Sequence, residues 1–401
     1  MQANNILNRK TNIKKPTLTK NDFQTKRVVT LASAHGIHDT YSSFLAPLLP
    51  VLIERLSLLK VEAGAFLIFQ QLPSILQPVI GHLADRLNFK RLVLLAPAVT
   101  AAAMSLFAIS KTYWMAAILL VISGLASAIL HAVAPAIISR FSGRLLGRGM
   151  SFWTISGEIG VMVGPVLIAT VISLFSISAA PWLMVGGIAA SILLAYWLRG
   201  VEFYSSENKP KTLQGSGRKI LRIFLPLAGI LIARSLLMAA VLTYMPVYLT
   251  EKGVSLWLAS SSITLLQASG IIGILISSSI MDRIGARWIF LGSLIGSSLA
   301  LLLLLQSEGV MQIIVMILLG AISLSVVPIG MAVMQENFPN NRSFANGLYL
   351  STIFIANSGA GVLMGRLGDL YGMPSAFLWS VWVCLLGIPF ILFLPQPVRN
   401  A

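Results

Sequence analysis

The sequence predicts an all-α membrane protein with twelve transmembrane helices in two pseudo-symmetric six-helix bundles. Hydrophobic residues make up 56% of the chain and charged residues 10%, and the mean hydropathy is +0.85, unlike the balance of a soluble domain. The apolar residues form stretches of about 20 residues, the length at which a helix crosses roughly 30 Å of hydrocarbon. A short charged motif also occurs twice, at matching places in two halves. These runs lack the alternation of membrane β-strands, so helices are expected.

Twelve apolar stretches are long enough to cross the bilayer. They lie near 28–52, 62–84, 91–109, 113–139, 150–175, 180–198, 220–249, 256–281, 288–306, 309–335, 344–367 and 375–395. One substantial polar break, at 199–219, divides them into two sets of six. The sequence therefore predicts a basic tail (1–27), a first bundle (28–198), a linker (199–219), a second bundle (220–396) and a short tail (397–401).

The formal net charge of +16 is explained by its distribution. Lys and Arg concentrate on the N-terminal tail, on alternate loops, on the linker and near the C-terminus, and such an excess marks the cytoplasmic side of a membrane protein. We therefore expect a multi-pass protein of the cytoplasmic (inner) membrane with both termini in the cytoplasm. Attraction to anionic membrane lipid is a secondary effect, and no nucleic-acid partner is expected. The first stretch is too long and too polar for a cleavable signal, so the tail should be retained.

A charged turn follows the second stretch of each half. Asp85-Arg86 is followed by Asn88, and Asp282-Arg283 is followed by Gly285, residues that tolerate a positive φ. Three further pairs repeat at nearly constant distances of 199, 197 and 198 residues: Pro47 and Pro246, Gln70 and Gln267, Gly149 and Gly347. The chain is therefore interpreted as an internal duplication.

Twelve spans, two halves, a basic linker and the loop motif at 81–91 resemble the major facilitator superfamily. The resemblance covers residues 28–395 and implies two bundles that rock around a central site. It also implies a cytoplasmic latch made by Gly81, Asp85, Arg86, Lys90 and Arg91, with Asp282 and Arg283 as its degenerate second copy. Asn88 and Phe89 depart from the motif's glycine and arginine, and Phe89 weakens the charge relay. A generic charged turn is the alternative interpretation.

The fifth stretch contains Gly160, Gly164 and Pro165. Small residues at i and i+4 let two helices approach closely, and an internal proline kinks a helix. This run resembles the Gly-x-x-x-Gly-Pro motif of drug and proton antiporters, although plain helix packing explains it as well. The antiporters' arginine in the fourth stretch is missing, and the titratable His131 lies there instead. Together with His35-Gly36-Ile37-His38-Asp39, this combination most resembles the fosmidomycin-resistance-type exporters.

Ionisable groups inside hydrocarbon are costly and are therefore functional candidates. Asp39 lies roughly 16 Å into the first stretch, and His35 lies one turn before it on the same face. Burial disfavours the charged carboxylate while an imidazolium favours it, so a proton shared by Asp39 and His35 is physically reasonable. Packing specificity and direct substrate contact are the alternative roles of Asp39. Glu158 is either a second proton site, a counter-ion or structural, and His131 is either a proton relay or a packing contact.

Arg234 is the one permanent cation embedded in a predicted span. It either pairs with Asp39 or Glu158 across the halves or holds an anionic group of the substrate. Other polar and aromatic side chains could line a substrate site or simply join helices. The candidate substrate-binding residues are Arg234, Gln70, Gln267, His38, Tyr41, Tyr244 and Asn357.

Enzyme chemistry is not indicated, because no phosphate-binding loop, nucleophile elbow or catalytic carboxylate pair is present. Cys384 is the single cysteine, which excludes an intramolecular disulfide. The His35, His38 and Asp39 cluster could hold a weak divalent cation, which makes metal transport a minor alternative. We expect no metal site and no cofactor. A fixed channel is disfavoured by the duplicated halves.

The sequence thus favours a secondary active transporter that works by alternating access and exports a small amphiphilic or anionic compound in exchange for protons. Proton-coupled uptake of a small nutrient or metabolite is the first alternative. A membrane sensor or assembly partner that does not transport is the second. The expected partners are a small-molecule substrate, protons and membrane lipid, and the expected state is a monomer.

Overall fold

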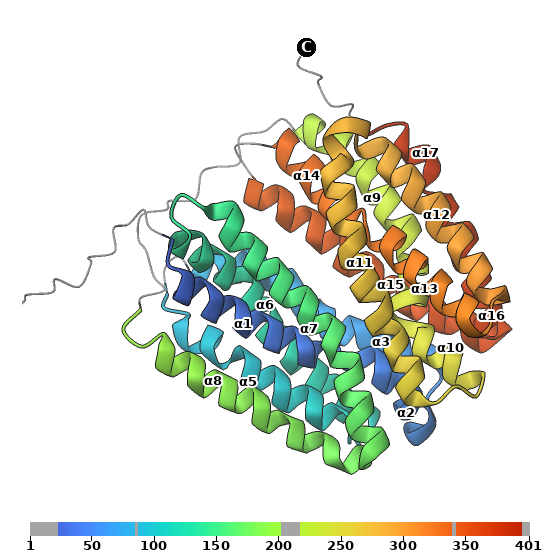
Figure 1. Ribbon diagram of the computed structural model, residues 1–401, viewed down its shortest axis with the longest axis horizontal. Helices are drawn as coiled ribbons and strands as arrows, with labels where there is room; N and C mark the ends of the chain where they lie inside the picture. Colours follow the sequence, from blue (N-terminus) through green and yellow to red (C-terminus); the bar gives the residue numbers. More distant parts are fainter. Residues whose placement is uncertain (1–22, 85–86, 202–216, 339–341, 395–401) are drawn as a thin grey trace, which may run out of the picture.

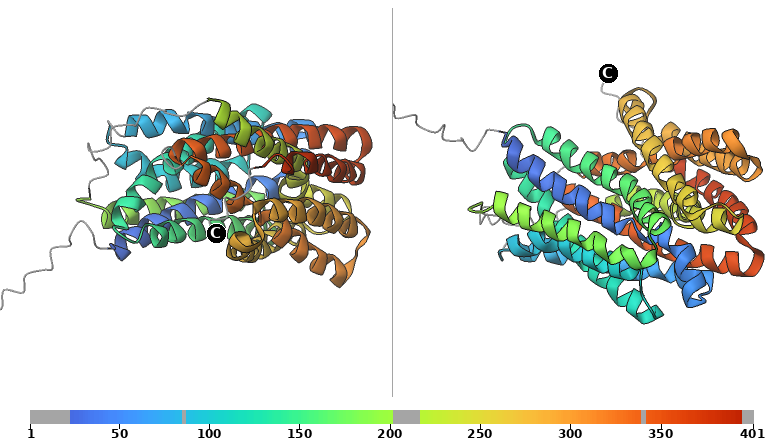
Figure 2. Two further views of the ribbon diagram at one scale, coloured as in Figure 1. Left: turned by 90° about the horizontal axis from the view of Figure 1, so that it is seen from above. Right: turned by 60° about the horizontal axis from the view of Figure 1, so that its bottom comes forward.

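The computed structural model describes residues 23–84, 87–201, 217–338 and 342–394, and every regular element in these ranges is a helix. The helices form two groups that lie side by side, one built from the first half of the chain and one from the second (Figure 1). The views in Figure 2 show the same two groups from other sides.

The first group contains ten helical segments. They are α1 (Thr25–Ser42), α2 (Leu45–Leu56), α3 (Lys60–Gln71), the 3₁₀ turn η1 (Leu72–Leu76), α4 (Gln77–Ala84), α5 (Lys90–Phe107), α6 (Tyr113–Phe141), α7 (Leu146–Leu174), the 3₁₀ segment η2 (Ile177–Leu183) and α8 (Met184–Trp197).

The second group repeats this plan with its own breaks. Its segments are α9 (Gly217–Ala239), the π-helical turn η3 (Ala240–Tyr244), α10 (Met245–Glu251), α11 (Leu256–Ile284), α12 (Ala286–Gln306), α13 (Gly309–Leu324), α14 (Val327–Asn337), α15 (Arg342–Tyr371), α16 (Met373–Leu385) and α17 (Ile388–Ile391).

The predicted all-helical membrane fold is confirmed. Within the described residues, eleven helices are long and apolar enough to cross a membrane. The remaining predicted crossing, the first in the chain at 28–52, is built from α1 and α2. A break at Ser43 and Phe44 separates these two helices. The corresponding first crossing of the second half is also interrupted, by η3 before Pro246. Proline lacks the N–H of a helical hydrogen bond, so such breaks free backbone groups near the middle of the crossing.

The two groups contact each other at one end. The contacts join the C-terminal half of α7 to the N-terminal half of α11, where the Thr264 hydroxyl donates to the Met162 carbonyl at 2.7 Å and the Trp257 indole donates to Thr170 at 3.0 Å. They also join the start of α3 to the end of α15. There, a Cβ on Gly64 would lie 2.3 Å from the Gly361 carbonyl oxygen, so glycine is required for the approach.

Asp369 fastens the start of α3 to the end of α15. Its two carboxylate oxygens accept hydrogen bonds from the backbone N–H groups of Lys60 and Val61, each at 2.9 Å. The Lys60 ammonium pairs with Glu251 at 2.9 Å, and the Tyr244 hydroxyl lies 2.8 Å from the Lys60 carbonyl oxygen. A carboxylate at a helix N-terminus also meets the positive end of the helix dipole. We call this set the end junction: Lys60, Val61, Tyr244, Glu251 and Asp369.

The end junction generates a prediction about the spacing of the halves. Asp369→Asn replaces one acceptor oxygen by an N–H₂ donor that faces a backbone N–H, and the lost charged hydrogen bond should weaken the junction by about 1.5 kcal/mol. Spin labels at Lys111→Cys and Glu308→Cys, both exposed at this end, in a Cys384→Ser background report the separation. Pulsed electron–electron double resonance should show a second population of the variant with a longer distance between the two spin labels.

Glu54→Gln is the matched control, because Glu54 is an exposed carboxylate at the same end of the first group. It should leave the distance distribution unchanged. An unchanged distribution in Asp369→Asn would show that the junction does not depend on this carboxylate.

Candidate functional site

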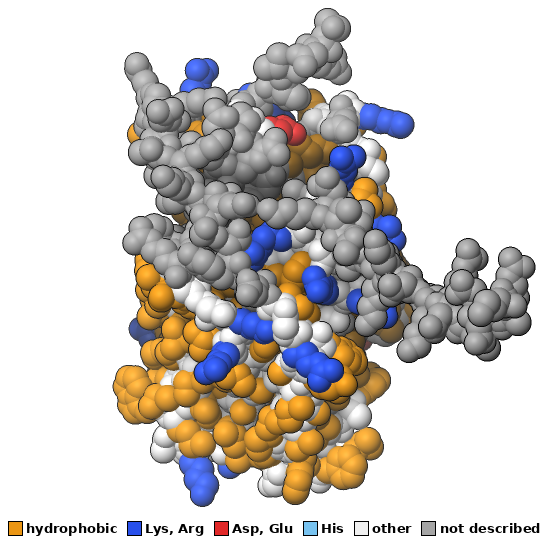
Figure 3. Space-filling model, turned by 90° about the vertical axis from the view of Figure 1, so that its left-hand side faces the viewer, with side chains coloured by type: hydrophobic (Ala, Val, Ile, Leu, Met, Phe, Trp, Pro, Cys, Tyr) orange, Lys and Arg blue, Asp and Glu red, His pale blue; other side chains and the backbone are white. Residues whose placement is uncertain are grey.

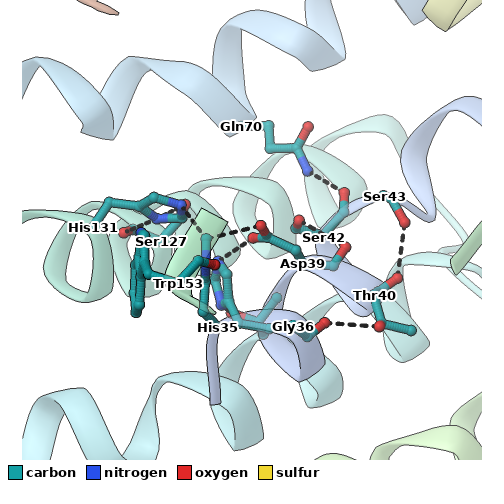
Figure 4. Close-up of polar contacts among 12 residues, drawn as sticks. His35, Gly36, Asp39, Thr40, Ser42, Ser43, Gln70, Ser127, His131 and Trp153 are labelled. Carbon is teal, nitrogen blue, oxygen red and sulfur yellow. Dashed lines mark hydrogen bonds and ion pairs between the residues drawn. The ribbon is translucent and has the colours of Figure 1, made fainter. Parts of the chain in front are cut away.

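A pair of ionisable side chains lies one helical turn apart on α1. Nε2 of His35 is 2.9 Å from Oδ2 of Asp39, and both side chains are largely buried. The local sequence dictates this contact, because residues at i and i+4 of a helix share one face. Figure 4 shows that the two side chains point toward one another and that His131 of α6 reaches the same point.

Backbone carbonyls determine which ring nitrogens carry protons. Nδ1 of His35 lies 2.9 Å from the carbonyl oxygen of Trp153, and Nδ1 of His131 lies 2.9 Å from that of Ser127. A carbonyl oxygen only accepts, so both Nδ1 atoms must donate. The two Nε2 atoms, 3.1 Å apart, then depend on a further proton for their hydrogen bonds.

The three side chains of His35, Asp39 and His131 therefore form one cluster of ionisable groups. Their nearest ligand atoms all lie within 4.8 Å of one another. Two lone pairs and a carboxylate that face each other repel unless a proton is shared among them. One additional proton held between them would relieve this repulsion. The same three ligand atoms lie close enough together that they could also hold a metal ion.

His38 lies next to the cluster, with its ring centroid 5.7 Å from that of His131. It is fully buried, its Nδ1 lies 2.9 Å from the Thr100 hydroxyl of α5, and its Nε2 lies 3.9 Å from Oδ1 of Asp39. That last distance exceeds a hydrogen bond, and no group among the described residues bonds this Nε2. One carboxylate oxygen of Asp39 is thus bound to His35, while the other remains available.

Glycines on α7 let α1 approach closely enough to form the cluster. A Cβ on Gly157 would lie 2.4 Å from Cε1 of His35 and 2.8 Å from Oδ2 of Asp39. A Cβ on Gly160 would lie 2.2 Å from the Gly36 carbonyl oxygen, and one on Gly164 would lie 2.1 Å from that of Thr40. The His35 ring also stacks on Trp153 of α7, with centroids 3.7 Å apart. Gly157, Gly160 and Gly164 therefore shape the site through close packing.

Asp39 and His131 open onto a cavity of about 420 Å³ between the two groups of helices. The cavity lies beyond the junction contacts, toward the end at which α1 begins. It is lined from the first group by Asp39, Ser42, Ser43, Leu45, Ala46, Leu67, Gln70, Gln71, Ser74, Gln77, Ser123, Ser127, His131 and Val161, and from the second by Leu242, Thr243, Ile263, Gln267 and Phe354. A volume of this size suits a small organic molecule.

The other candidates divide between the cavity and the helix contacts. Gln70 and Gln267 line the cavity. The Tyr41 hydroxyl donates to the Leu183 carbonyl inside the first group, and Tyr244 belongs to the end junction. Arg234 is buried, and its guanidinium donates to the Ser323 carbonyl within the second group.

Two further candidates, Asn357 and Glu158, are not among the residues that line the cavity. Asn357 is half-buried on α15. Glu158 is half-buried on α7, within electrostatic range of Asp39 and His35. The other ionisable groups near Asp39 are thus the three histidines and Glu158.

The residues expected to form a cytoplasmic latch are only partly described. Gly81 lies in α4, Lys90 begins α5, Arg91 is exposed, and Arg283 is exposed in the last turn of α11. Asp85 and Arg86 lie outside the described residues, as does the side chain of Asp282. Pro165 lies inside α7, directly after Gly164.

Two helical groups around a cavity, with ionisable side chains in its wall, are the architecture of a secondary transporter. A family model described as Major Facilitator Superfamily matches residues 31–286 and 259–401. The chain therefore belongs to the Major Facilitator Superfamily, as the sequence resemblance predicted. It is a multi-pass membrane transporter and not an enzyme.

Two curated proteins are similar over most of their length. The "Fosmidomycin resistance protein" of Escherichia coli is 23% identical over 382 residues, which cover 91% of this chain and 92% of that protein. An "Uncharacterized MFS-type transporter YfnC" of Bacillus subtilis is 23% identical over 387 residues, which cover 93% of this chain and 94% of that protein.

Solved transporter structures share the fold at low identity. The nucleoside transporter NupG has a TM-score of 0.73 and 14% identity, with 93% of this chain and 99% of that chain covered. The D-xylose-proton symporter has a TM-score of 0.72 and 14% identity, with 93% and 98% covered. A bacterial homologue of the human lysosomal transporter Spinster, in an inward-facing and occupied conformation, has a TM-score of 0.74 and 13% identity, with 92% and 96% covered.

Sequence reasoning did not single out the residues that support the cluster. Ser127 and Thr100 orient His131 and His38, and Gly157 gives the His35–Asp39 pair its space. Gly157 precedes the Gly-x-x-x-Gly-Pro motif by three residues, and this spacing of glycines could have indicated that it belongs to the same helix contact. No comparable signal exists for Thr100.

Gly157→Ala tests whether close packing holds the cluster together. The added Cβ meets His35 and Asp39, so unfolding in detergent should become easier by about 1–3 kcal/mol. The matched control is Gly292→Ala on α12, where a Cβ would meet nothing within 4 Å. Thermal unfolding of the purified variants measures the difference.

A double variant separates local crowding from general damage to the helix. His35→Ala removes the ring that the new Cβ meets, so Gly157→Ala should cost much less stability in that background. Equal costs in both backgrounds would exclude the proposed clash.

Proposed function

We propose that this transporter exports a small amphiphilic compound in exchange for protons, by alternating access. The observation that carries the proposal is the cluster of His35, Asp39 and His131, whose ligand atoms lie within 4.8 Å of one another and of which Asp39 and His131 line the cavity. A group that both holds a proton and borders the substrate cavity can couple the two ligands, because each changes the charge that the other meets.

The mechanism follows from the proton's position in the cluster. With the proton present, the carboxylate of Asp39 is neutralised by the His35 imidazolium. When the proton leaves, His35 becomes neutral and Asp39 keeps an uncompensated negative charge. The cavity therefore changes charge by one unit while its shape is retained. Glu158 on α7 adds a further negative charge, which would stabilise the protonated form of His35.

The orientation of the molecule in the membrane is part of the proposal. Exposed cationic side chains gather on the end opposite the junction (Figure 3). Those of the described residues include Arg91, Arg144, Arg148, Arg199 and Arg283. The positive-inside rule assigns this end to the cytoplasm of a bacterial inner membrane, with both termini there. The structure then represents the inward-facing state of a transporter that we expect to act as a monomer surrounded by lipid.

Two moving bodies, 28–198 and 220–396, complete the cycle in this proposal. Opening of the end junction would be accompanied by closure at the cytoplasmic end. There the loop of Gly81, Asp85, Arg86, Lys90 and Arg91 would act as the latch, with Asp282 and Arg283 as its counterpart. The proton would then enter from outside and be released inward, while the compound moves in the opposite direction.

The direction of transport draws on the relatives. The name "Fosmidomycin resistance protein" describes a protein that protects a cell from a drug, and this supports export for the chain as well. The D-xylose-proton symporter shares only the fold. Uptake with protons remains the competing direction, and the following experiment separates the two.

Everted membrane vesicles test the proposal. Respiration acidifies their lumen, and an added compound that is exported should draw protons out, seen as recovery of a quenched acridine dye. A panel of amphiphilic antibiotics, phosphonates and sugars should contain such a compound for the wild type. Asp39→Asn should lose the response to that compound, because an amide cannot take up the shared proton.

Glu54→Gln is the matched control, since it neutralises an exposed carboxylate far from the cavity. It should respond like the wild type. A response that persists in Asp39→Asn would remove this carboxylate from the coupling. Compound that accumulates only when the gradient is reversed would indicate uptake.

A further inference from the structure

The cavity wall contains polar side chains from both halves of the protein. Gln267 of α11 is 8% exposed and lines the cavity, yet its Oε1 is buried and bonds no group among the described residues. A buried acceptor without a partner costs free energy, which a ligand that donates a hydrogen bond would recover after the amide of Gln267 rotates toward it.

Gln70 of α3 supplies a second acceptor. Its Nε2 donates to the Ser42 carbonyl at 2.8 Å, which fixes the orientation of the amide. The amide oxygen is then directed away from Ser42, as Figure 4 shows. Gln70 lines the cavity, so this oxygen can receive a donor from a bound molecule.

Asp39 supplies the third acceptor and the charge. Its Oδ2 is bound to Nε2 of His35 at 2.9 Å. Nε2 of His38 lies 3.9 Å from Oδ1, which is too far for a hydrogen bond. The cavity lining contains no Lys or Arg among the described residues. Its fixed charge is therefore negative whenever the shared proton has left.

We propose that the cavity takes up compounds with a basic nitrogen, as an ammonium or amidinium group, placed between Asp39 of the first half and Gln267 of the second. The nitrogen's N–H groups supply the donors that the three oxygens lack. Leu67, Leu242, Ile263 and Phe354 provide apolar wall for the rest of the molecule. This inference rests on the proposed antiport, because an exporter receives its cargo from the cytoplasm after the proton has left.

Charge balance makes the nitrogen and the proton alternatives. A cation beside Asp39 replaces the His35 imidazolium as the counter-ion, so binding of the cation expels the shared proton. A carboxylate or phosphonate in the same place would meet the Asp39 charge without a permanent cation to offset it.

Three matched dyes test the substrate class with the full-length protein in detergent. Dansylcadaverine carries a primary amine, its N-acetyl derivative is neutral, and dansyl-6-aminohexanoate carries a carboxylate on a chain of similar length. At mildly alkaline pH, the amine should bind about tenfold more tightly than either of the others, as expected for loss of a charged hydrogen bond. At a lower pH, where the shared proton is still bound, binding of the amine should also release protons into weakly buffered solution.

Gln267→Leu removes the acceptor in the second half and should weaken binding of the amine by about tenfold while leaving the weak binding of the carboxylate unchanged. Gln306→Leu, an exposed position at the end of α12, is the matched control and should bind like the wild type. Binding of the carboxylate as tight as that of the amine, or no binding of the amine, would overturn the inference.

The same dyes in everted vesicles separate this inference from the proposed function. If an anionic or neutral compound draws protons through Asp39 while the amine does not, the antiport stands and the substrate class is wrong. If no compound draws protons in the wild type, the antiport itself fails.

Discussion

The close approach of α1 and α7 is the constraint on which the site depends. Gly157, Gly160 and Gly164 remove side chains where the two helices meet, and the backbone of α7 then comes within hydrogen-bond distance of His35. The Trp153 carbonyl fixes the imidazole in one tautomer, and the Trp153 ring supports its face. A methyl group at Gly157 would occupy the space of the ion pair itself. Packing and proton chemistry are therefore set by the same few backbone positions.

A second constraint acts between the halves. The end junction closes one end of the molecule through a helix N-terminus capped from the opposite half, which ties the position of α3 directly to that of α15. The cavity lies next to these contacts, and Asp39, His131, Gln70 and Gln267 line its wall.

The fold could be predicted from the sequence because its signal is local. Apolar length, polar breaks and a duplicated loop define helices and halves without any long-range contact. The His35–Asp39 pair was likewise predictable, since one helical turn joins the two residues. His131 could be flagged as a polar residue in an apolar run, but its contact with His35 spans 96 residues and arises only from tertiary packing. Asp369 and Lys60, 309 residues apart, carry no sequence signal for their contact. The position of Arg234 also required the structure, because its nearest acceptor is a backbone carbonyl that any residue could supply.

The central claim is that one shared proton joins His35, Asp39 and His131, with both Nδ1 atoms held by carbonyls. The chain has four histidines, so ¹⁵N-histidine labelling gives a spectrum simple enough to assign by single substitutions. Solid-state NMR of the protein in lipid bilayers, recorded as a pH series, measures the protonation of every ring nitrogen. The account predicts that Nδ1 of His35 and of His131 stay protonated throughout, while Nε2 of His35 loses its proton as the pH rises, at a different pH in Asp39→Asn. An unprotonated Nδ1 on either residue would contradict it. So would a His35 ring that titrates at the same pH in the wild type and in Asp39→Asn.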